Sequence, residues 1–333
     1  MEQRMLGSLW PVSLLTLGGG GLGQVWGETD RKEAVATARE AADLGITLFD
    51  MAPLYGRGEA EAVIGEAFGG KLPGGARVTT KCFLGSRPSE EVQGKFERSL
   101  QRSLEAMKLE QVDLFFLHTN ICPDDYVYKD DPENQDRWAT RWSLYVDTVI
   151  PAMAKLKAQG LITDWGITGT GLPKSIMDAL RHDEKPAAVQ AVTNLLDSAG
   201  SMRRYDEPPE PRNIIRTAKN NGVGVMGIRA VQAGALTEAL DRELPADHPE
   251  MRDFEKAAPF RKLCAELGED PAIIAHRYAL SMDGVDTVVL GVKNREELRA
   301  CAKAAEAGVL EPELRQKIDA LRLNFQIPRM PID

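Results

Sequence analysis

The segment ITLFDMAPLYG, residues 46–56, contains the residues around which the rest of the chain is organised. It begins with apolar strand-forming residues and reaches a carboxylate at Asp50. Pro53 and Gly56 then break the regular pattern, and Tyr55 lies between them on a predicted loop. Since Asp often starts a turn after a strand, this segment alone does not define a site. The other predicted strands decide whether Asp50 and Tyr55 belong to one.

Short apolar segments alternate with helical patterns along the whole chain. The predicted strands are apolar throughout and cover residues 14–17, 46–50, 77–81, 111–117, 162–167, 187–191, 223–228 and 285–290. The predicted helices cover residues 31–44, 59–68, 88–107, 144–159, 173–181, 211–220, 260–267, 271–282, 294–305 and 312–323. Strands of this kind are typical of a parallel sheet covered by helices. Their repetition over 333 residues predicts a (β/α)8 TIM barrel, a single domain of residues 1–333.

A doubly wound open sheet is the structural alternative. The first predicted strand runs into a glycine-rich segment, residues 18–23. In a dinucleotide-binding open sheet, an acidic residue is expected about 20 residues after such glycines. Asp50 lies further along the chain than that, so the pattern favours the barrel.

Composition limits the partners and the compartment. A net charge of −9 argues against nucleic acid or an anionic membrane as a partner. The cysteines are far apart and predict neither a zinc site nor a disulfide framework; they are Cys82, Cys122, Cys264 and Cys301. The apolar residues 12–17 lead into glycines without a signal-peptide cleavage pattern, and no segment is long and apolar enough to span a membrane. A cytoplasmic location is therefore expected.

Three successive predicted strands end on polar side chains. These are Asp50, Lys81 and His118, and Tyr55 lies on the loop after the first of them. Active sites of TIM barrels lie at the carboxyl ends of the strands. Neighbouring strands are about 5 Å apart, so the four side chains are expected to converge on one rim.

The chemistry of these four side chains indicates the reduction of a carbonyl. The positive charge of Lys81 is expected to lower the pKa of Tyr55 and make it a proton donor at neutral pH. Asp50 offsets the desolvation of Lys81 by pairing with it. His118 can donate a hydrogen bond to a substrate oxygen, which becomes an alkoxide as it is reduced. The hydride must come from a bound cofactor, and no metal cluster is predicted nearby.

Several motifs resemble those of the aldo-keto reductases. They are FDMAPLYGRGE at residues 49–59, TTK at 79–81, DLFFLH at 113–118 and GLITDWGIT at 160–168. The resemblance extends over the whole chain. It implies a (β/α)8 barrel that reduces aldehydes and ketones with NAD(P)H and without a metal. It also implies that Tyr55 is the general acid of a tetrad with Asp50, Lys81 and His118.

The same resemblance places the cofactor along the rim. It implies contacts from Thr168, Gly169, Gln190, Gly291, Lys293, Arg295 and Glu297. Gly20, Asp50 and Arg229 are added to the expected cofactor contacts from their positions in the chain. The start of a helix beside a basic residue is a suitable phosphate site. Lys293 stands where the family often has a cation for the 2′-phosphate, so NADPH is expected, with NADH as the alternative.

The chain departs from the family pattern at three cofactor positions. Ile228 stands where an aromatic residue often stacks on the nicotinamide, and Ala300 and Cys301 stand where Glu and Asn often contact the adenine. The irregular segments 121–143 and 234–258 follow the fourth and seventh strands, where loops set specificity. The walls of a pocket for a small carbonyl substrate are expected to be Trp26, Tyr55, His118 and Trp142.

Two other functions are compatible with these residues. A desolvated Lys81 could form a Schiff base in a lyase or aldolase, although pairing with Asp50 would keep it charged. A barrel that binds the cofactor and docks on a partner without catalysis could retain the same tetrad.

Overall fold

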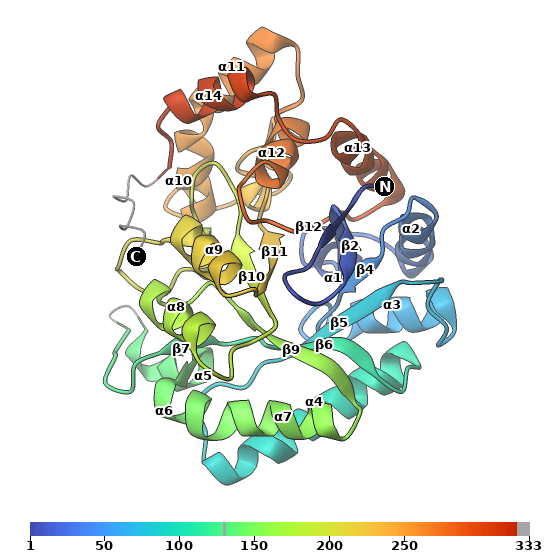
Figure 1. Cartoon of the computed structure of the whole chain (residues 1–333). Coiled ribbons are helices and arrows are strands. Elements are labelled where there is room, and N and C mark those ends of the chain that lie inside the picture. Colours follow the sequence, from blue (N-terminus) through green and yellow to red (C-terminus); the bar gives the residue numbers. More distant parts are fainter. Residues whose placement is uncertain (129–130, 325–333) are drawn as a thin grey trace.

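The computed structural model describes residues 1–128 and 131–324, and its centre is a closed parallel barrel (Figure 1). Around the barrel the order is β3 (Leu15–Gly18), β4 (Leu48–Asp50), β5 (Arg77–Cys82), β6 (Val112–Leu117), β9 (Ile162–Thr168), β10 (Ala188–Val192), β11 (Gly224–Ile228) and β12 (Thr287–Leu290). The last strand pairs with the first, with Leu290 opposite Leu17. The barrel prediction is confirmed, and the open sheet is wrong because β12 and β3 leave no sheet edge.

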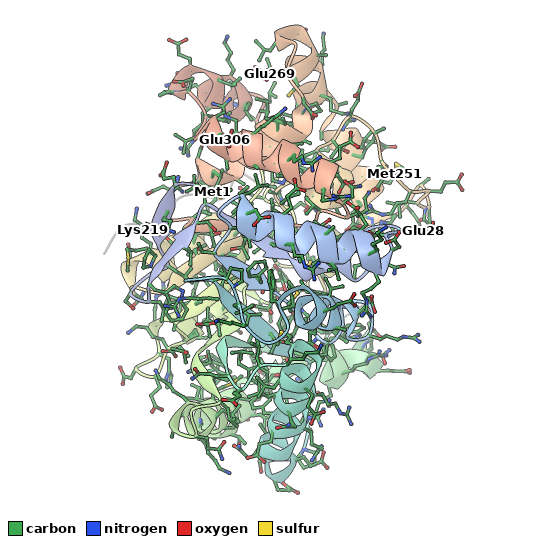
Figure 2. All side chains as sticks on the ribbon, turned by 90° about the vertical axis from the view of Figure 1, so that its right-hand side faces the viewer. Met1, Glu28, Lys219, Met251, Glu269 and Glu306 are labelled. Atoms are coloured by element: carbon green, nitrogen blue, oxygen red, sulfur yellow. The ribbon has the colours of Figure 1, made fainter. Side chains whose placement is uncertain are left out.

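Helices follow the strands and surround the barrel (Figure 1). The helices that follow successive strands are α2 (Arg31–Asp43), α3 (Glu59–Phe68), α4 (Ser89–Met107), α7 (Ile150–Ala158), α8 (Pro173–Arg181), α9 (Pro211–Asn220), α12 (Pro271–Leu280) and α13 (Arg295–Glu306). The ring of helices closes where α13 lies beside α2 (Figure 2). Ion pairs between Arg295 and Glu33 and between Arg299 and Glu40 link these two helices.

The sequence of α2 shows why these helices form where they do. The Asp30 side chain accepts a hydrogen bond of 2.7 Å from the backbone N–H of Glu33, which caps the first turn. Ala34, Ala38 and other small apolar residues at helical spacing are fully buried against the barrel. Gly45 follows the helix with φ +84°, a conformation that L side chains rarely adopt. The predicted end of the helix at this glycine is therefore correct.

A hairpin that was not predicted closes the amino-terminal end of the barrel. Its strands are β1 (Gln3–Met5) and β2 (Pro11–Ser13). Leu6 and Trp10 on its turn pack into a buried cluster with barrel residues that include Phe116. Strands of three residues carry too little periodicity to be recognised from the sequence.

The segment 121–143 has more regular structure than the sequence predicts. It contains most of β7 (Asn120–Cys122), then η1 (Pro132–Asn134), α5 (Gln135–Trp138) and β8 (Ala139–Arg141). The predicted helix 144–159 is also divided, into α6 (Trp142–Leu144), the π-helical η2 (Tyr145–Val149) and α7. Pro151 lacks the N–H that would continue the α-helical bonding at this point.

The segment 234–258 contains α10 (Pro249–Lys256), where the sequence indicates no regular structure. The remaining short or peripheral elements are α1 (Gly19–Leu22), η3 (Gly200–Met202), η4 (Gln232–Gly234), α11 (Ala258–Leu267) and α14 (Pro312–Ala320). In the part of the chain that the structure describes, no helix has the length and apolar character needed to cross a membrane.

Candidate active site

The alternation of side chains along β5 directs Lys81 into the barrel. In a strand, residues two apart point to the same face. Thr79 and Lys81 both reach Asp50 inside the barrel, whereas Thr80 between them points outward and donates to Glu61 on α3. The register places Asp50 opposite Thr79 on the neighbouring strand. Asp50 and Lys81, at the ends of neighbouring strands, therefore meet inside the barrel as the sequence predicts.

Asp50 and Lys81 form an ion pair that is shielded from water. Lys81 Nζ donates 2.8 Å to Asp50 Oδ2 and 2.9 Å to the carbonyl oxygen of Met51. The other carboxylate oxygen, Oδ1, accepts from Thr79 at 2.6 Å and from Gln190 at 2.7 Å. Burial alone would lower the pKa of Lys81, but the opposing charge of Asp50 and the Tyr55 hydroxyl raise it overall. Lys81 is therefore a cation at neutral pH.

Tyr55 lies over this pair at the mouth of the barrel. Lys81 Nζ is 4.8 Å from the centroid of the Tyr55 ring. Burial of the phenol raises the pKa of Tyr55 more than the charge of Lys81 lowers it, and Asp50 adds to the increase. The expectation that Lys81 lowers this pKa is wrong for the net effect, because desolvation of the phenolate outweighs attraction to the ammonium. Tyr55 is consequently a protonated phenol at neutral pH.

His118 lies beside Tyr55 as a neutral imidazole. The two rings are perpendicular, with centroids 5.9 Å apart. Burial, with a further contribution from the charge of Lys81, lowers the pKa of His118 to about 3. Its Nδ1 is buried and has no hydrogen-bond partner among the described residues. A neutral ring with one nitrogen sealed off can present only its other nitrogen, Nε2, to a ligand.

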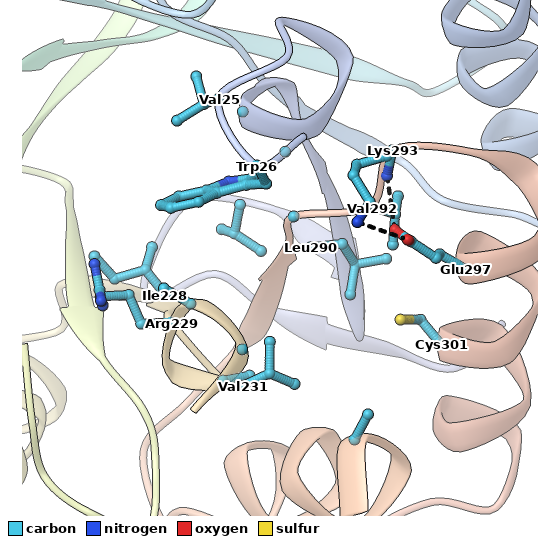
Figure 3. A pocket seen from close by; sticks show the side chains of 18 of the residues that line it. Val25, Trp26, Ile228, Arg229, Val231, Leu290, Val292, Lys293, Glu297 and Cys301 are labelled. Atoms are coloured by element: carbon cyan, nitrogen blue, oxygen red, sulfur yellow. Dashed lines mark hydrogen bonds and ion pairs between the residues drawn. The ribbon is translucent and has the colours of Figure 1, made fainter. Parts of the chain in front are cut away.

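A cavity of about 600 Å³ is lined by Asp50, Tyr55 and His118 together with residues from the ends of other barrel strands. Figure 3 shows the part of it around Trp26, Ile228 and Lys293. Asp50, Tyr55 and His118 line one end, and Lys293 and Cys301 line the other. The predicted cofactor residues that line it, besides Asp50, are Gly20, Thr168, Gln190, Arg229, Gly291, Lys293 and Glu297. Most of the predicted site is therefore brought together around one space.

Four of the predicted residues do not line this cavity, and one of them, Lys81, is fully buried beneath Tyr55. Gly169 lies next to it, where its N–H donates 2.7 Å to the carbonyl oxygen of Gln190. Arg295 points to the outside and pairs with Glu33 on α2. The Trp142 ring packs on Tyr145, with centroids 5.6 Å apart. Trp142 is thus not a wall of this space, because α6 directs it toward the ring of helices.

Trp26 lies across the cavity as expected (Figure 3). Two glycines make room for its indole. A Cβ on Gly20 would lie 2.5 Å from Trp26 Nε1, and a Cβ on Gly291 would lie 3.2 Å from Trp26 Cδ1. Ile228 is also on the wall, where the family pattern often has an aromatic residue. Among the residues that Figure 3 labels, the aromatic ring on this wall is that of Trp26. Trp26 lies between α1 and α2 and not at the end of β11.

Arg229 lines the cavity but is already bound to a carboxylate. Its Nη2 donates 2.6 Å to Glu250 Oε1, and its Nε donates 2.8 Å to Gln232. The side chains of Arg229 and Glu250 are 5% and 2% exposed. Arg229 therefore ties the end of β11 to α10. This contact could not be read from the sequence, because α10 was not predicted.

The far end also contains His276, Asp241 and Arg242, which no motif of the sequence indicates. His276 Nδ1 bonds the carbonyl oxygen of Ala272 at 2.8 Å, and its Nε2 lies 3.8 Å from Cys301 Sγ. Burial raises the pKa of Cys301 to about 12, so the thiol is protonated. Asp241 and Arg242 line the same end and come from the irregular segment after β11. Their position depends on how that segment folds back, for which the sequence carries no signal.

The cavity fits a nicotinamide dinucleotide. Its volume lies within the range of about 300–1,000 Å³ that is usual for small-molecule sites. Close backbone packing shapes one wall, since a Cβ on Gly21 would lie 1.9 Å from the carbonyl oxygen of Val292. The amino terminus of α13, capped by Asn294, adjoins the end lined by Lys293. Within residues 1–128 and 131–324, no cluster of three or more His, Cys, Asp or Glu could hold a metal ion.

Comparison with known proteins identifies the class. The model of the aldo/keto reductase family matches residues 14–323. L-galactose dehydrogenase from Arabidopsis thaliana is 27% identical over 327 residues, which cover 96% of this chain and 94% of that protein. The chain belongs to the aldo/keto reductase family, whose members are oxidoreductases that use nicotinamide cofactors.

Solved structures agree with the fold. Aldo-keto reductase AKR11C1 from Bacillus halodurans, in its holo form, superposes with a TM-score of 0.69 at 24% identity and 96% coverage of both chains. Glycerol dehydrogenase AKR11B4 from Gluconobacter oxydans superposes with a TM-score of 0.72 at 22% identity and 99% coverage of both chains. At these identities the likeness supports the barrel architecture only.

Proposed function

We propose that this protein interconverts a carbonyl and an alcohol, with Tyr55 as the proton donor and a nicotinamide nucleotide in the rim cavity. One observation carries the proposal. The protonated phenol of Tyr55, the charged Lys81 and the neutral His118 meet at one end of the cavity that fits the nucleotide. When bound there, the nucleotide supplies or accepts the hydride.

Each of the four side chains has a distinct part in the proton transfer. Tyr55 gives its proton to the carbonyl oxygen as that oxygen gains negative charge. Lys81, 4.8 Å from the phenol ring centroid, stabilises the phenolate that remains. Asp50 holds the ammonium at 2.8 Å and keeps it charged. His118 donates from its other ring nitrogen, Nε2, to the substrate oxygen and positions it beside Tyr55.

The Schiff-base alternative is disfavoured by the state of Lys81. A lysine must lose its proton to attack a carbonyl, and Asp50 and Tyr55 raise the pKa of Lys81. The ammonium is also fully buried beneath Tyr55. Incubation with aldehydes and borohydride is therefore expected to leave Lys81 unmodified, as read by peptide mass spectrometry.

The experiment that tests the proposal is the substitution Tyr55→Phe. It removes the donated proton and leaves the ring, so turnover should fall by about 10²–10⁴-fold. Binding of the nicotinamide nucleotide, followed by fluorescence, should be retained. A similar protein is named L-galactose dehydrogenase, so hydroxylated aldehydes and the corresponding alcohols are the first substrates to test.

Tyr145→Phe is the matched control. The Tyr145 hydroxyl is also buried, has no partner among the described residues, and does not line the cavity. This variant should turn over like the wild type. Turnover by Tyr55→Phe at the level of Tyr145→Phe would show that Tyr55 is not the acid. Nucleotide binding without turnover on any carbonyl or alcohol would instead favour a non-catalytic, cofactor-binding barrel.

A further inference from the structure

The cation at the far end of the cavity is held by two carboxylates. Lys293 Nζ lies 2.6 Å from Asp241 Oδ2 and 3.2 Å from Glu297 Oε1. The second oxygen of Glu297 accepts a hydrogen bond of 2.9 Å from the backbone N–H of Lys293. Figure 3 shows Glu297 turned toward Lys293 at the start of α13. The ammonium on which the expectation of NADPH rested is therefore already paired.

The second cation on this part of the lining shares one of these carboxylates. Arg242 Nη1 lies 3.1 Å from Asp241 Oδ1, and its Nη2 donates 2.7 Å to the carbonyl oxygen of Ala233. Asp241 thus lies between the two cations. Asp270, which caps α12, adds a further carboxylate to the lining. Three carboxylates face two cations at this end of the cavity.

This arrangement suits hydroxyl groups better than a phosphate. A phosphate monoester carries about −1.5 to −2 charges at pH 7. To reach Lys293 it would have to displace Asp241 and Glu297 or lie against them, and like charges at close range are unfavourable. The hydroxyls of an unphosphorylated ribose can instead donate hydrogen bonds to the carboxylate oxygens.

We infer that Asp241 and Glu297 make the cavity select NADH over NADPH. The inference rests on the proposed function, because it assigns the far end of the same cavity to the adenosine ribose. It reverses the preference that Lys293 indicates in the sequence. Lys293 here orients the two carboxylates toward the ribose, and its charge does not remain available for a 2′-phosphate.

The test is a pair of titrations of the full-length protein with NADH and NADPH, each followed by nucleotide fluorescence. NADH should bind at least about tenfold more tightly than NADPH. In Glu297→Gln and in Asp241→Asn, the ratio of the two dissociation constants should shift toward NADPH by about tenfold. The ratio is measured within one variant, so a loss of folded protein affects both titrations equally.

Glu296→Gln is the matched control. It removes the same charge from the adjacent residue of α13, which is exposed and does not line the cavity. Its ratio should equal that of the wild type. Since Asp241 and Glu297 are 43% and 38% exposed, added salt should screen them and reduce the wild-type preference.

The outcomes separate this inference from the proposed function. If the wild-type protein binds NADPH as tightly as NADH or more tightly, the inferred preference for NADH is wrong, but the proposed oxidoreductase function is not contradicted. A shift in Glu297→Gln no larger than that in Glu296→Gln would also overturn the role of Glu297. If neither nucleotide binds, the proposed function itself fails.

Discussion

Lys81 Nζ and Asp50 Oδ2 are 2.8 Å apart, and the two side chains are 0% and 2% exposed. Loss of either side chain of such a buried pair is strongly destabilising, because the other charge would remain buried without a counter-charge. Asp50 also accepts hydrogen bonds from Thr79 and Gln190, so its orientation is fixed from three directions. The pair therefore affects both the stability of the barrel and the pKa of Tyr55.

Asp50→Asn is expected to leave the Lys81 ammonium buried without its counter-charge. The free energy of unfolding should fall by about 3–5 kcal/mol, as for other broken buried pairs. Turnover should also be lost, because Lys81 can then lose its proton and no longer stabilises the Tyr55 phenolate. Urea unfolding measures the first effect and steady-state kinetics the second.

A surface pair provides the control for this experiment. Lys174 and Asp178 lie 2.6 Å apart on α8, with side chains 84% and 37% exposed. Asp178→Asn should lower the free energy of unfolding by less than about 1 kcal/mol. Equal losses from the two substitutions would show that burial of the Lys81–Asp50 pair is not what stabilises the barrel.

The neutral state of His118 predicts a specific pH dependence. Its pKa in the folded protein is about 3, against an ordinary value of 6.5. In the window between these values the unfolded chain binds a proton that the folded protein excludes, so the free energy of unfolding falls as the pH decreases. His118→Gln should weaken this decrease. NMR of the His118 ring protons should show no titration near the ordinary value.

Lys81→Met separates the two causes of that low pKa. Burial is the larger cause, so removing the nearby charge should raise the pKa of His118 only part of the way to its ordinary value. The measurement is the pH titration of the His118 NMR signal in the variant. A return to the full ordinary value would contradict burial as the main cause.

The tetrad could be predicted from the sequence because it follows from the barrel itself. Parallel strands that are adjacent in a barrel bring their carboxyl ends to one rim, so Asp50, Lys81 and His118 had to converge once the strands were assigned. The inward orientation of Thr79 could be predicted in the same way, since Thr79 lies two residues before Lys81 on β5.

Other features depend on packing that sequence periodicity does not encode. The pKa of Tyr55 is set by how completely neighbouring groups bury the phenol, and that outweighs the adjacent charge. Asp241 reaches Lys293 only because an irregular segment folds back across the cavity. Trp142 was expected in the pocket because its loop is on the correct face, but the division of the following helix directs it elsewhere.

Gly21→Ala is expected to disturb the wall between α1 and the start of α13. The added Cβ would lie 1.9 Å from the carbonyl oxygen of Val292, so the backbone must move. Overpacking of this kind lowers the free energy of unfolding by about 1–3 kcal/mol, and it should also weaken nucleotide binding. Thermal unfolding and a fluorescence titration measure the two effects.

Gly74→Ala is the matched control, because a Cβ there would meet nothing within 4 Å and the backbone is not in the left-handed region. It should leave nucleotide binding unchanged and should stabilise the protein slightly, by up to about 1 kcal/mol. If Gly21→Ala behaves like Gly74→Ala, the close approach of the two backbones does not shape the cavity.

The buried Arg229–Glu250 pair predicts sensitivity to acid. Burial would raise the pKa of Glu250, but hydrogen bonds from Ser201 and the charge of Arg229 outweigh it and hold the pKa at about 2, below the ordinary 4.5. A carboxylate with a lowered pKa contributes stability that is complete above its unfolded pKa and is lost as the pH falls toward the folded one. The contribution of Glu250 should therefore be present at neutral pH and disappear between these two values.

Glu250→Gln tests this contribution directly. At pH 7 the variant should be less stable than the wild type, because Arg229 is left buried without its counter-charge. Toward pH 3 the difference should shrink, since the wild type loses its own contribution there. Glu255→Gln, at an exposed position on the same helix, should show no pH-dependent difference. A constant gap between Glu250→Gln and wild type at all pH values would mean that Glu250 stabilises α10 by packing and not by its charge.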